Sequence, residues 1–142
     1  MEPNSHLSKI NETPHAKALN LKLVSAAAST VVIQLPSSEA IIGDPVNRTT
    51  HGGAITTLLD TACGAAIFQT QNNFRAMATL DLRVDHMRPA SADMAINAHA
   101  DCYRLTHTIA FVRATLYTND INQPIATAMG SFVRSNEEFP TQ

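Results

Sequence analysis

The sequence is poor in cysteine, glycine, aromatic residues and charge. Its 142 residues include two cysteines, five glycines, no tryptophan and 15% charged residues. The two cysteines form no C-x-x-C pair, so neither a disulfide framework nor a zinc module is indicated. No apolar run approaches the ~18 residues of a membrane-spanning helix, and the first residues lack the basic and then apolar order of a secretory signal. We therefore expect a soluble, cytoplasmic protein with reduced thiols.

Positive charge is scarce as well. Ten lysine and arginine residues against twelve acidic residues give a formal net charge of −2. This balance lacks the basic surface with which proteins bind nucleic acid, and the lysines are too dispersed for a membrane-binding patch. There is no G-x-S-x-G nucleophile elbow and no G-x-x-x-x-G-K phosphate loop. The composition, 44% apolar, predicts a compact domain that takes neither nucleic acid nor a membrane as its partner.

The pattern of apolar residues predicts an α+β fold. One convincing helix spans residues 52 to about 69, where an apolar stripe repeats at helical spacing. The stripe consists of Ile55, Leu59, Ala62 and Ala66. Strands are expected before the helix within residues 21–35, and after it at residues 78–88, 95–105, 108–117 and 124–134. A helix between a hairpin and a run of antiparallel strands predicts one sheet curled around one central helix.

The chain shows no internal domain boundary. We expect residues 1–18 to form a polar leader with a short helical turn, residues 19–136 to form the domain, and residues 137–142 to form a tail. Residues 36–50 are expected to be a loop. One sheet and one helix leave a large face uncovered, and oligomerisation would cover it.

The glycines draw attention to the start of the helix. Four of the five lie within 22 residues, and Gly52 and Gly53 open the predicted helix. The first N–H groups of a helix have no acceptor within it, and they lie at the positive end of the helix dipole. Without side chains in the way, these donors can reach a ligand oxygen, as in an oxyanion hole. A tight turn into a buried helix explains the two glycines equally well.

Asp60 favours the catalytic interpretation. It is the only charged residue between Arg48 and Arg75, and it lies on a helix that is otherwise apolar enough to be buried. A lone buried carboxylate is unfavourable without a partner or a role. The alternative is a structural carboxylate satisfied by a hydroxyl group or by a strand arginine such as Arg83.

The length of the helix separates the two candidate groups. Asp60 follows Gly52 by eight residues, which is about 12 Å at a rise of 1.5 Å per residue. One carbonyl bound by the Gly52 N–H therefore lies out of reach of Asp60 in the same chain. If both groups act on one carbonyl, Asp60 comes from a second subunit, and a two-fold axis gives two equivalent sites.

These residues resemble the hotdog-fold acyl-CoA thioesterases, in the PaaI-type branch of the 4-hydroxybenzoyl-CoA thioesterase superfamily. The resemblance rests on His51-Gly52-Gly53 with Asp60 nine positions after the histidine, and it extends over about residues 16–135. It implies a sheet wrapped around a helix and a homodimer with a continuous intersubunit sheet, often a dimer of dimers. It also implies hydrolysis of an acyl-CoA substrate without a metal or organic cofactor.

The resemblance also implies roles for individual residues. The Gly52 N–H would bind the thioester oxygen, and Asp60 of the partner subunit would be the nucleophile or the general base. Thr79 falls where related enzymes use a serine or threonine to hold the attacking water, and His51 would orient the loop. A neutral imidazole is favoured at His51, because a helix N-terminus repels positive charge. Substrate contacts are expected at Gly53, Asn47, Arg104, His107, Thr108 and Phe68.

The sequence departs from the family pattern before the helix. Many relatives carry an asparagine six residues before the histidine, where this chain has Pro45; Asn47 is expected to take its place. Arg104 and His107 are candidates for the coenzyme A phosphates or are solvated turn residues. For Arg88 and Arg134 a surface ion pair is favoured over a phosphate contact.

Other chemistry is less well supported. Cys63 lies in the middle of the helix, where its thiol should stay protonated. Phe68, Phe74 and Ile67 are expected to line an aryl pocket or a fatty-acyl channel. A hotdog hydratase or dehydratase and a non-catalytic acyl-CoA-binding protein remain as alternatives, although the Phe-Pro-Gly type of helix start of the hydratases is missing here.

Overall fold

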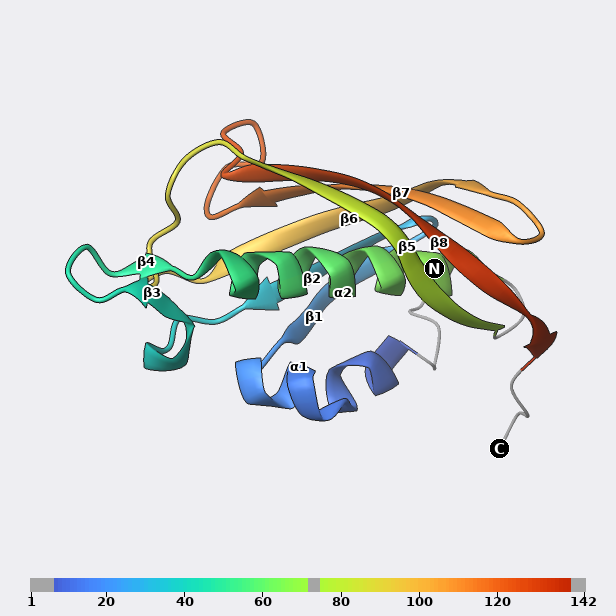
Figure 1. The fold of residues 1–142 in the computed structure, drawn as a ribbon, viewed down its shortest axis with the longest axis horizontal. Helices are drawn as coiled ribbons and strands as arrows, with labels where there is room; N and C mark the ends of the chain where they lie inside the picture. Colours follow the sequence, from blue (N-terminus) through green and yellow to red (C-terminus); the bar gives the residue numbers. More distant parts are fainter. Residues whose placement is uncertain (1–6, 72–74, 139–142) are drawn as a thin grey trace.

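One long helix, α2 (Gly52–Thr70), lies along one face of an antiparallel sheet (Figure 1). The computed structural model describes residues 7–71 and 75–138. The remaining elements, in chain order, are η1 (Leu7–Glu12), α1 (Pro14–Leu19), β1 (Lys22–Ala27), β2 (Thr30–Leu35), η2 (Glu39–Ile41), β3 (Ile42–Asp44), β4 (Thr49–Thr50), β5 (Arg75–His86), β6 (Ile96–Leu105), β7 (Ile109–Tyr117) and β8 (Ala126–Glu138).

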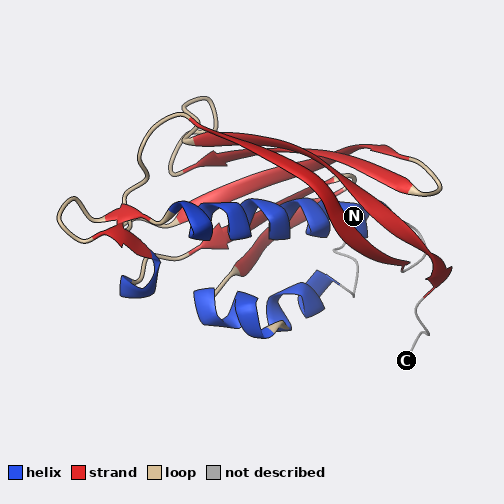
Figure 2. Cartoon of the chain, in the orientation of Figure 1, coloured by secondary structure: helices blue, strands red, loops and turns tan. Residues whose placement is uncertain are grey.

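The main sheet has six strands in the order β1-β2-β6-β7-β8-β5, and every neighbouring pair is antiparallel. Two strands before α2, β1 and β2, and the four strands after it therefore belong to one sheet, which curls over the helix (Figure 2). α1 and η1 lie on the side of α2 that faces away from the sheet. The architecture confirms the predicted α+β class, one sheet wrapped around one central helix.

Small apolar side chains let the sheet approach α2 closely. The four residues of the predicted stripe, Ile55, Leu59, Ala62 and Ala66, are all buried. Alanines alternate along the inner face of β6 and β7, where Ala98, Ala100, Ala110 and Ala114 are buried as well. Close packing of this kind excludes water from the side of the helix that faces the sheet, so a polar group on that side needs a partner.

The predicted loop at residues 36–50 contains more structure than expected. It holds η2 and the short hairpin of β3 and β4, in which Ile42 pairs with Thr50. The hairpin has no alternating apolar run, so periodicity gave no signal for it. Gly43 explains part of the geometry, because a Cβ atom there would lie 2.8 Å from the His51 Cα. The hairpin thus passes directly against the start of α2.

The predicted leader is partly packed into the core. The short helical turn is present as α1, and η1 precedes it. Leu7 and Ala16 are 1% and 3% exposed, so this segment covers apolar surface although its sequence is mostly polar. Residues 1–6 and 139–142 of the predicted leader and tail, and Phe74, lie outside the described residues.

Strand β5 contains a bulge within the predicted strand at residues 78–88. On β8, Thr79 pairs with Phe132 and Asp81 pairs with the adjacent Ser131, so Leu80 is left without a partner position. Strict alternation would put Thr79 on the same face as Asp81. The bulge instead turns Thr79 to the inner face that it shares with Phe132, toward α2. Leu80 is 58% exposed.

None of the helices in the described residues is long and apolar enough to span a membrane.

Candidate active site

The amides at the start of α2 differ in whether they have an acceptor. His51 is the N-cap, and its Nδ1 accepts a hydrogen bond from the Gly53 N–H at 2.8 Å. The His51 carbonyl accepts from Ala54 and Ile55. Among the described residues, none accepts from the Gly52 N–H. The first turn therefore keeps one backbone donor open, at the positive end of the helix dipole.

The surroundings of the two glycines support the same distinction. A Cβ atom at Gly52 would meet nothing within 4 Å, whereas one at Gly53 would lie 2.9 Å from the His51 Nδ1. Gly52 thus faces open space, and Gly53 is a glycine because the capping imidazole needs its room. The expectation that both amides are available to a ligand is met at Gly52 and not at Gly53.

The cap indicates the tautomer of His51. Because Nδ1 accepts the Gly53 N–H, the ring proton is assigned to Nε2. The Nε2–H remains as a second donor beside Gly52.

Asp60 lies on the third turn of α2 and contacts β5. Its Oδ1 accepts a hydrogen bond of 2.7 Å from the Thr79 hydroxyl group, and its side chain is half-buried. The bulge in β5 is what brings Thr79 to this position. Arg83, the other partner considered for Asp60, pairs with Asp85 instead. The carboxylate therefore has a hydroxyl partner, while none of the ion pairs in the described part of the chain neutralises it.

One protomer holds the two halves of the predicted site apart. Gly52 and Asp60 lie on the same straight helix, separated by about 12 Å along its axis. His51 and Gly52 form one half at the start of α2, and Asp60 with Thr79 forms the other. Both halves are open to solvent, since Gly52 and Thr79 are exposed.

The remaining predicted contacts are scattered. Asn47 is exposed in the β3–β4 turn, where its Nδ2 donates to the Asp44 Oδ2 at 2.8 Å. Arg104, His107 and Thr108 are exposed at the β6–β7 turn, which lies at the opposite end of α2 from Gly52 (Figure 1). Phe68 is half-buried near the end of α2. The β3–β4 turn extends beyond the start of α2, away from the helix (Figure 1).

The interpretation of Arg88 and Arg134 as surface ion pairs is wrong. Arg88 is exposed and donates to the Gln123 carbonyl at 2.9 Å. Arg134 is 9% exposed, and its guanidinium bonds the Gln71 side chain and the Thr106 carbonyl. Burial, together with the nearby charge of Arg75, lowers the pKa of Arg134. Arg134 thus ties the β6–β7 turn to the end of α2, a role that no sequence pattern indicates.

One contact to the site face was missed from the sequence. The His15 Nε2 of α1 lies 3.2 Å from the Thr57 hydroxyl group, one turn before Asp60. The Thr57 hydroxyl itself donates to the Gly53 carbonyl at 2.9 Å, so His15 is the donor to Thr57. The two residues are 42 positions apart, and nothing in their spacing predicts the pair.

The buried cysteine in α2 is not a nucleophile. Burial, with a smaller contribution from the charge of Asp60, raises the pKa of Cys63 to about 12. The thiol is therefore protonated at neutral pH, as predicted. The described residues contain no group of three or more metal-ligating side chains that would hold a metal ion.

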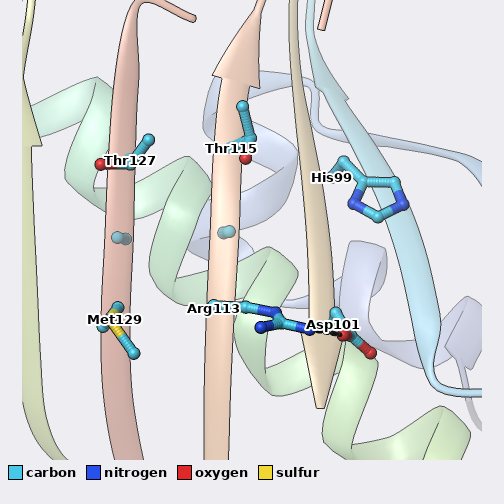
Figure 3. A pocket seen from close by; sticks show the side chains of 8 residues that line it. His99, Asp101, Arg113, Thr115, Thr127 and Met129 are labelled. Carbon is cyan, nitrogen blue, oxygen red and sulfur yellow. Dashed lines mark hydrogen bonds and ion pairs between the residues drawn. The ribbon is translucent and has the colours of Figure 1, made fainter. Parts of the chain in front are cut away.

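A hollow of about 450 Å³ lies elsewhere. It opens on the outer face of the sheet, between side chains of β6, β7 and β8 (Figure 3). His99, Asp101, Arg113 and Met129 are among its lining residues. None of the predicted site residues lines it. The candidate site is instead the exposed inner face formed by α2 and β5.

Comparison with known proteins places this geometry in context. The model of the Thioesterase superfamily matches residues 47–125, a segment that includes His51, Asp60 and Thr79. A crystal structure of a Pseudomonas aeruginosa protein is 38% identical, with a TM-score of 0.83 over 92% of this chain and 97% of that one. The medium/long-chain acyl-CoA thioesterase YigI of Salmonella typhimurium is 24% identical over 120 residues, 75% of this chain and 77% of YigI. The PaaI protein of the Escherichia coli phenylacetic acid degradation operon shares the fold, with a TM-score of 0.80 at 18% identity over 92% of this chain and 91% of that one.

Proposed function

Because the chain belongs to the Thioesterase superfamily, we propose that it hydrolyses the thioester bond of an acyl-CoA at a site shared between two subunits. The observation that carries the proposal is the open Gly52 N–H at the start of α2, since the other first-turn amides have acceptors. The exposed Asp60–Thr79 pair supplies the second half of the site.

The Gly52 N–H binds the thioester oxygen and stabilises the negative charge that develops there. Such a preorganised donor acts on charge that is present only in the transition state, and one donor is worth about 3 kcal/mol. The helix dipole adds to this stabilisation. The neutral His51 keeps the cap in place and leaves its Nε2–H beside the carbonyl.

Asp60 acts as general base on a water molecule. The Thr79 hydroxyl proton is committed to the Asp60 Oδ1, so Thr79 offers the water only its lone pairs. A water that donates one proton to Thr79 and the other to the Asp60 Oδ2 directs its own lone pair at the thioester carbon. Attack forms the new C–O bond, and Asp60 takes the proton. The C–S bond then breaks to release the coenzyme A thiolate, which takes that proton from Asp60 and so regenerates the base.

Isotope labelling tests for direct attack by Asp60 in which water then opens the acyl-enzyme at the Asp60 carbonyl carbon. We expect single turnovers in H₂¹⁸O to place the label in the product acid and none in the protein. Mass spectrometry of the peptide that contains Asp60 is the measurement. Label in that peptide would mean that the carboxylate forms an acyl-enzyme and that water attacks the Asp60 carbonyl carbon.

The second subunit joins along β5. This strand lies at an edge of the main sheet. Its Leu80 is an apolar side chain that is exposed to solvent in the single chain. An edge strand with free backbone groups pairs readily with a copy of itself. Two-fold pairing of β5 brings the α2 helices side by side and antiparallel, and places Gly52 of each protomer near the partner's Asp60. We propose a homodimer as the smallest active unit.

The relatives and the residues near the end of α2 indicate candidate classes of acyl group, but not one particular substrate. One relative carries the name of a medium/long-chain acyl-CoA thioesterase and another that of a phenylacetic acid degradation protein. Phe68, half-buried near the end of α2, suits an aliphatic or an aryl acyl group. The expectation that Ile67 lines the acyl pocket is wrong, because its side chain is fully buried in the core. A panel of short, medium, long and aromatic acyl-CoA esters identifies the substrate, and we expect activity to survive chelation of metal ions.

Replacement of the carboxylate tests the proposal. Asp60→Asn keeps the shape and the bond to Thr79 but removes the base, so we expect kcat to fall about 10²- to 10⁴-fold while acyl-CoA binding and folding persist. The control is the same protein assayed for hydration of an enoyl-CoA. Undiminished thioester cleavage by Asp60→Asn, or hydration as the main activity, would refute the assignment.

A further inference from the structure

Arg48 adopts an unusual backbone conformation four residues before Gly52. Its φ is 53°, in the left-handed region that residues with a Cβ rarely adopt. The other left-handed residues in the described ranges, Asn20 and Ala28, end a helix and turn a hairpin. A long side chain in this conformation persists only where its surroundings hold it.

The side chain of Arg48 is held by two acidic residues. Its Nε and Nη2 donate to Asp93 at 3.0 and 2.8 Å, and Nη2 also donates to Glu39 at 2.8 Å. The hydrogen bond from Arg48 lowers the pKa of Asp93. We call these three residues the Arg48 clamp. It joins η2, the β3–β4 turn and the turn before β6, which are far apart in the sequence.

Backbone hydrogen bonds connect the segment between the Arg48 clamp and α2 to neighbouring parts of the chain. The Arg48 carbonyl accepts from the Ala92 N–H at 2.9 Å, and the Thr50 N–H donates to the Ala90 carbonyl at 2.8 Å. The His51 N–H donates to the Ile41 carbonyl at 2.8 Å. Arg48, Thr50 and His51 are thus each bonded to a neighbouring segment, and Gly52 follows directly after His51.

We propose that the Arg48 clamp is a positioning device for catalysis: it holds the segment before α2 so that the Gly52 N–H points at the thioester oxygen. This inference rests on the proposed thioesterase function. Arg48 does not touch the reacting atoms and is a positioning residue. Small displacements of a catalytic group reduce rates strongly, since a shift of about 1 Å is able to cost 10²-fold.

An ordinary surface ion pair would behave differently. Exposed pairs contribute little to stability, and many have no measurable effect. Arg113 and Asp101 form such a pair on the outer face of the sheet, at 3.2 Å (Figure 3). Arg113→Gln is therefore the matched control, because it breaks an exposed arginine–aspartate pair that lies outside the candidate site.

The test variant is Arg48→Asn. Asparagine tolerates the left-handed conformation better than other residues with a Cβ, so the backbone strain is relieved while the clamp is lost. We expect kcat to fall about tenfold, with KM changed less than twofold and the melting temperature close to that of the wild type. Arg48→Lys keeps the charge but not the two-pronged geometry of the guanidinium. Its kcat should lie between those of the wild type and Arg48→Asn.

Amide hydrogen exchange supplies a second readout that does not depend on activity. Exchange in peptides that span residues 45–55 should be at least about tenfold faster in Arg48→Asn and unchanged in Arg113→Gln. Asp93→Asn should shift both readouts in the same direction as Arg48→Asn by a smaller factor, and it serves if Arg48→Asn fails to fold.

The outcomes separate this proposal from the function on which it rests. Wild-type kcat in Arg48→Asn, with or without faster exchange, would overturn the clamp, while loss of activity in Asp60→Asn would still uphold the thioesterase. An equal loss of kcat in Arg113→Gln would also overturn it. A wild-type protein that cleaves no acyl-CoA would refute the function itself.

Discussion

At the scale of single residues, the candidate site depends on which polar groups are left available. The Gly53 N–H donates to the His51 ring, so the Gly52 N–H is the donor that is left without an acceptor among the described residues. Asp60 keeps one carboxylate oxygen engaged by Thr79. The site is thus built from a free amide and a half-satisfied carboxylate, two groups that are unfavourable unless a ligand or water uses them.

Thr79 provides the residue-scale prediction. Thr79→Val removes the hydroxyl that holds Asp60 and the water, and hydrogen bonds to charged groups contribute about 1.5–3 kcal/mol. We therefore expect kcat for the preferred acyl-CoA to fall about 10- to 100-fold. Thr79→Ser keeps the hydroxyl and should retain most of the activity. Steady-state kinetics of the two variants is the measurement, and equal rates for both would exclude a role for the hydroxyl.

The sequence is informative at this scale where a residue stands out by type and spacing. Glycines at a helix start and a lone carboxylate on an apolar helix indicate Gly52 and Asp60, whereas the role of His51 is implied by the family resemblance. The prediction for Arg134 was wrong, because the sequence alone does not distinguish a solvated arginine from one that bonds to buried carbonyl groups. The assigned roles of these site residues stay predictions.

At the scale of elements, α2 and the long strands followed from periodicity, but the bulge in β5 did not. An alternating pattern does not reveal a single inserted residue, and here the insertion decides that Thr79 faces α2. The β3–β4 hairpin was also missed, since its pairing depends on a close approach at Gly43 rather than on apolar residues.

Gly130 tests the importance of the bulge. A Cβ atom there would lie 2.6 Å from the carbonyl oxygen of Asp81. This oxygen belongs to the backbone, so it moves only if strand β5 moves with it. We expect Gly130→Ala to lower stability by about 1–3 kcal/mol, seen as a drop of several degrees in melting temperature, and to reduce kcat by displacing Thr79.

A second glycine serves as the control for this prediction. At Gly64 a Cβ atom would meet the Phe132 ring at 3.9 Å, an ordinary contact. Alanine also stabilises a helix relative to glycine by up to about 1 kcal/mol. Gly64→Ala should therefore not lower the melting temperature. Similar destabilisation in both variants would show that the close approach at Gly130 is unimportant.

At the scale of the whole molecule, the proposed site requires a second subunit. The helix length separates the open amide from the carboxylate by about 12 Å, and the inner face of β5 and α2 is exposed in the single chain. The sequence predicted the fold class fully and this separation from the residue count. The docking of two copies involves surfaces that no periodicity describes, and it stays a prediction.

Mixed dimers of two inactive variants test the shared site most directly. Asp60→Asn removes the base, and Gly52→Val blocks the open amide at a position where a Cβ meets nothing within 4 Å in its own chain. In a mixed dimer, Gly52 of one protomer and the partner's Asp60 restore one intact site of two. Random reassembly of equal amounts should therefore recover about a quarter of wild-type activity, whereas a mixture no more active than its parents would contradict a site built from two subunits.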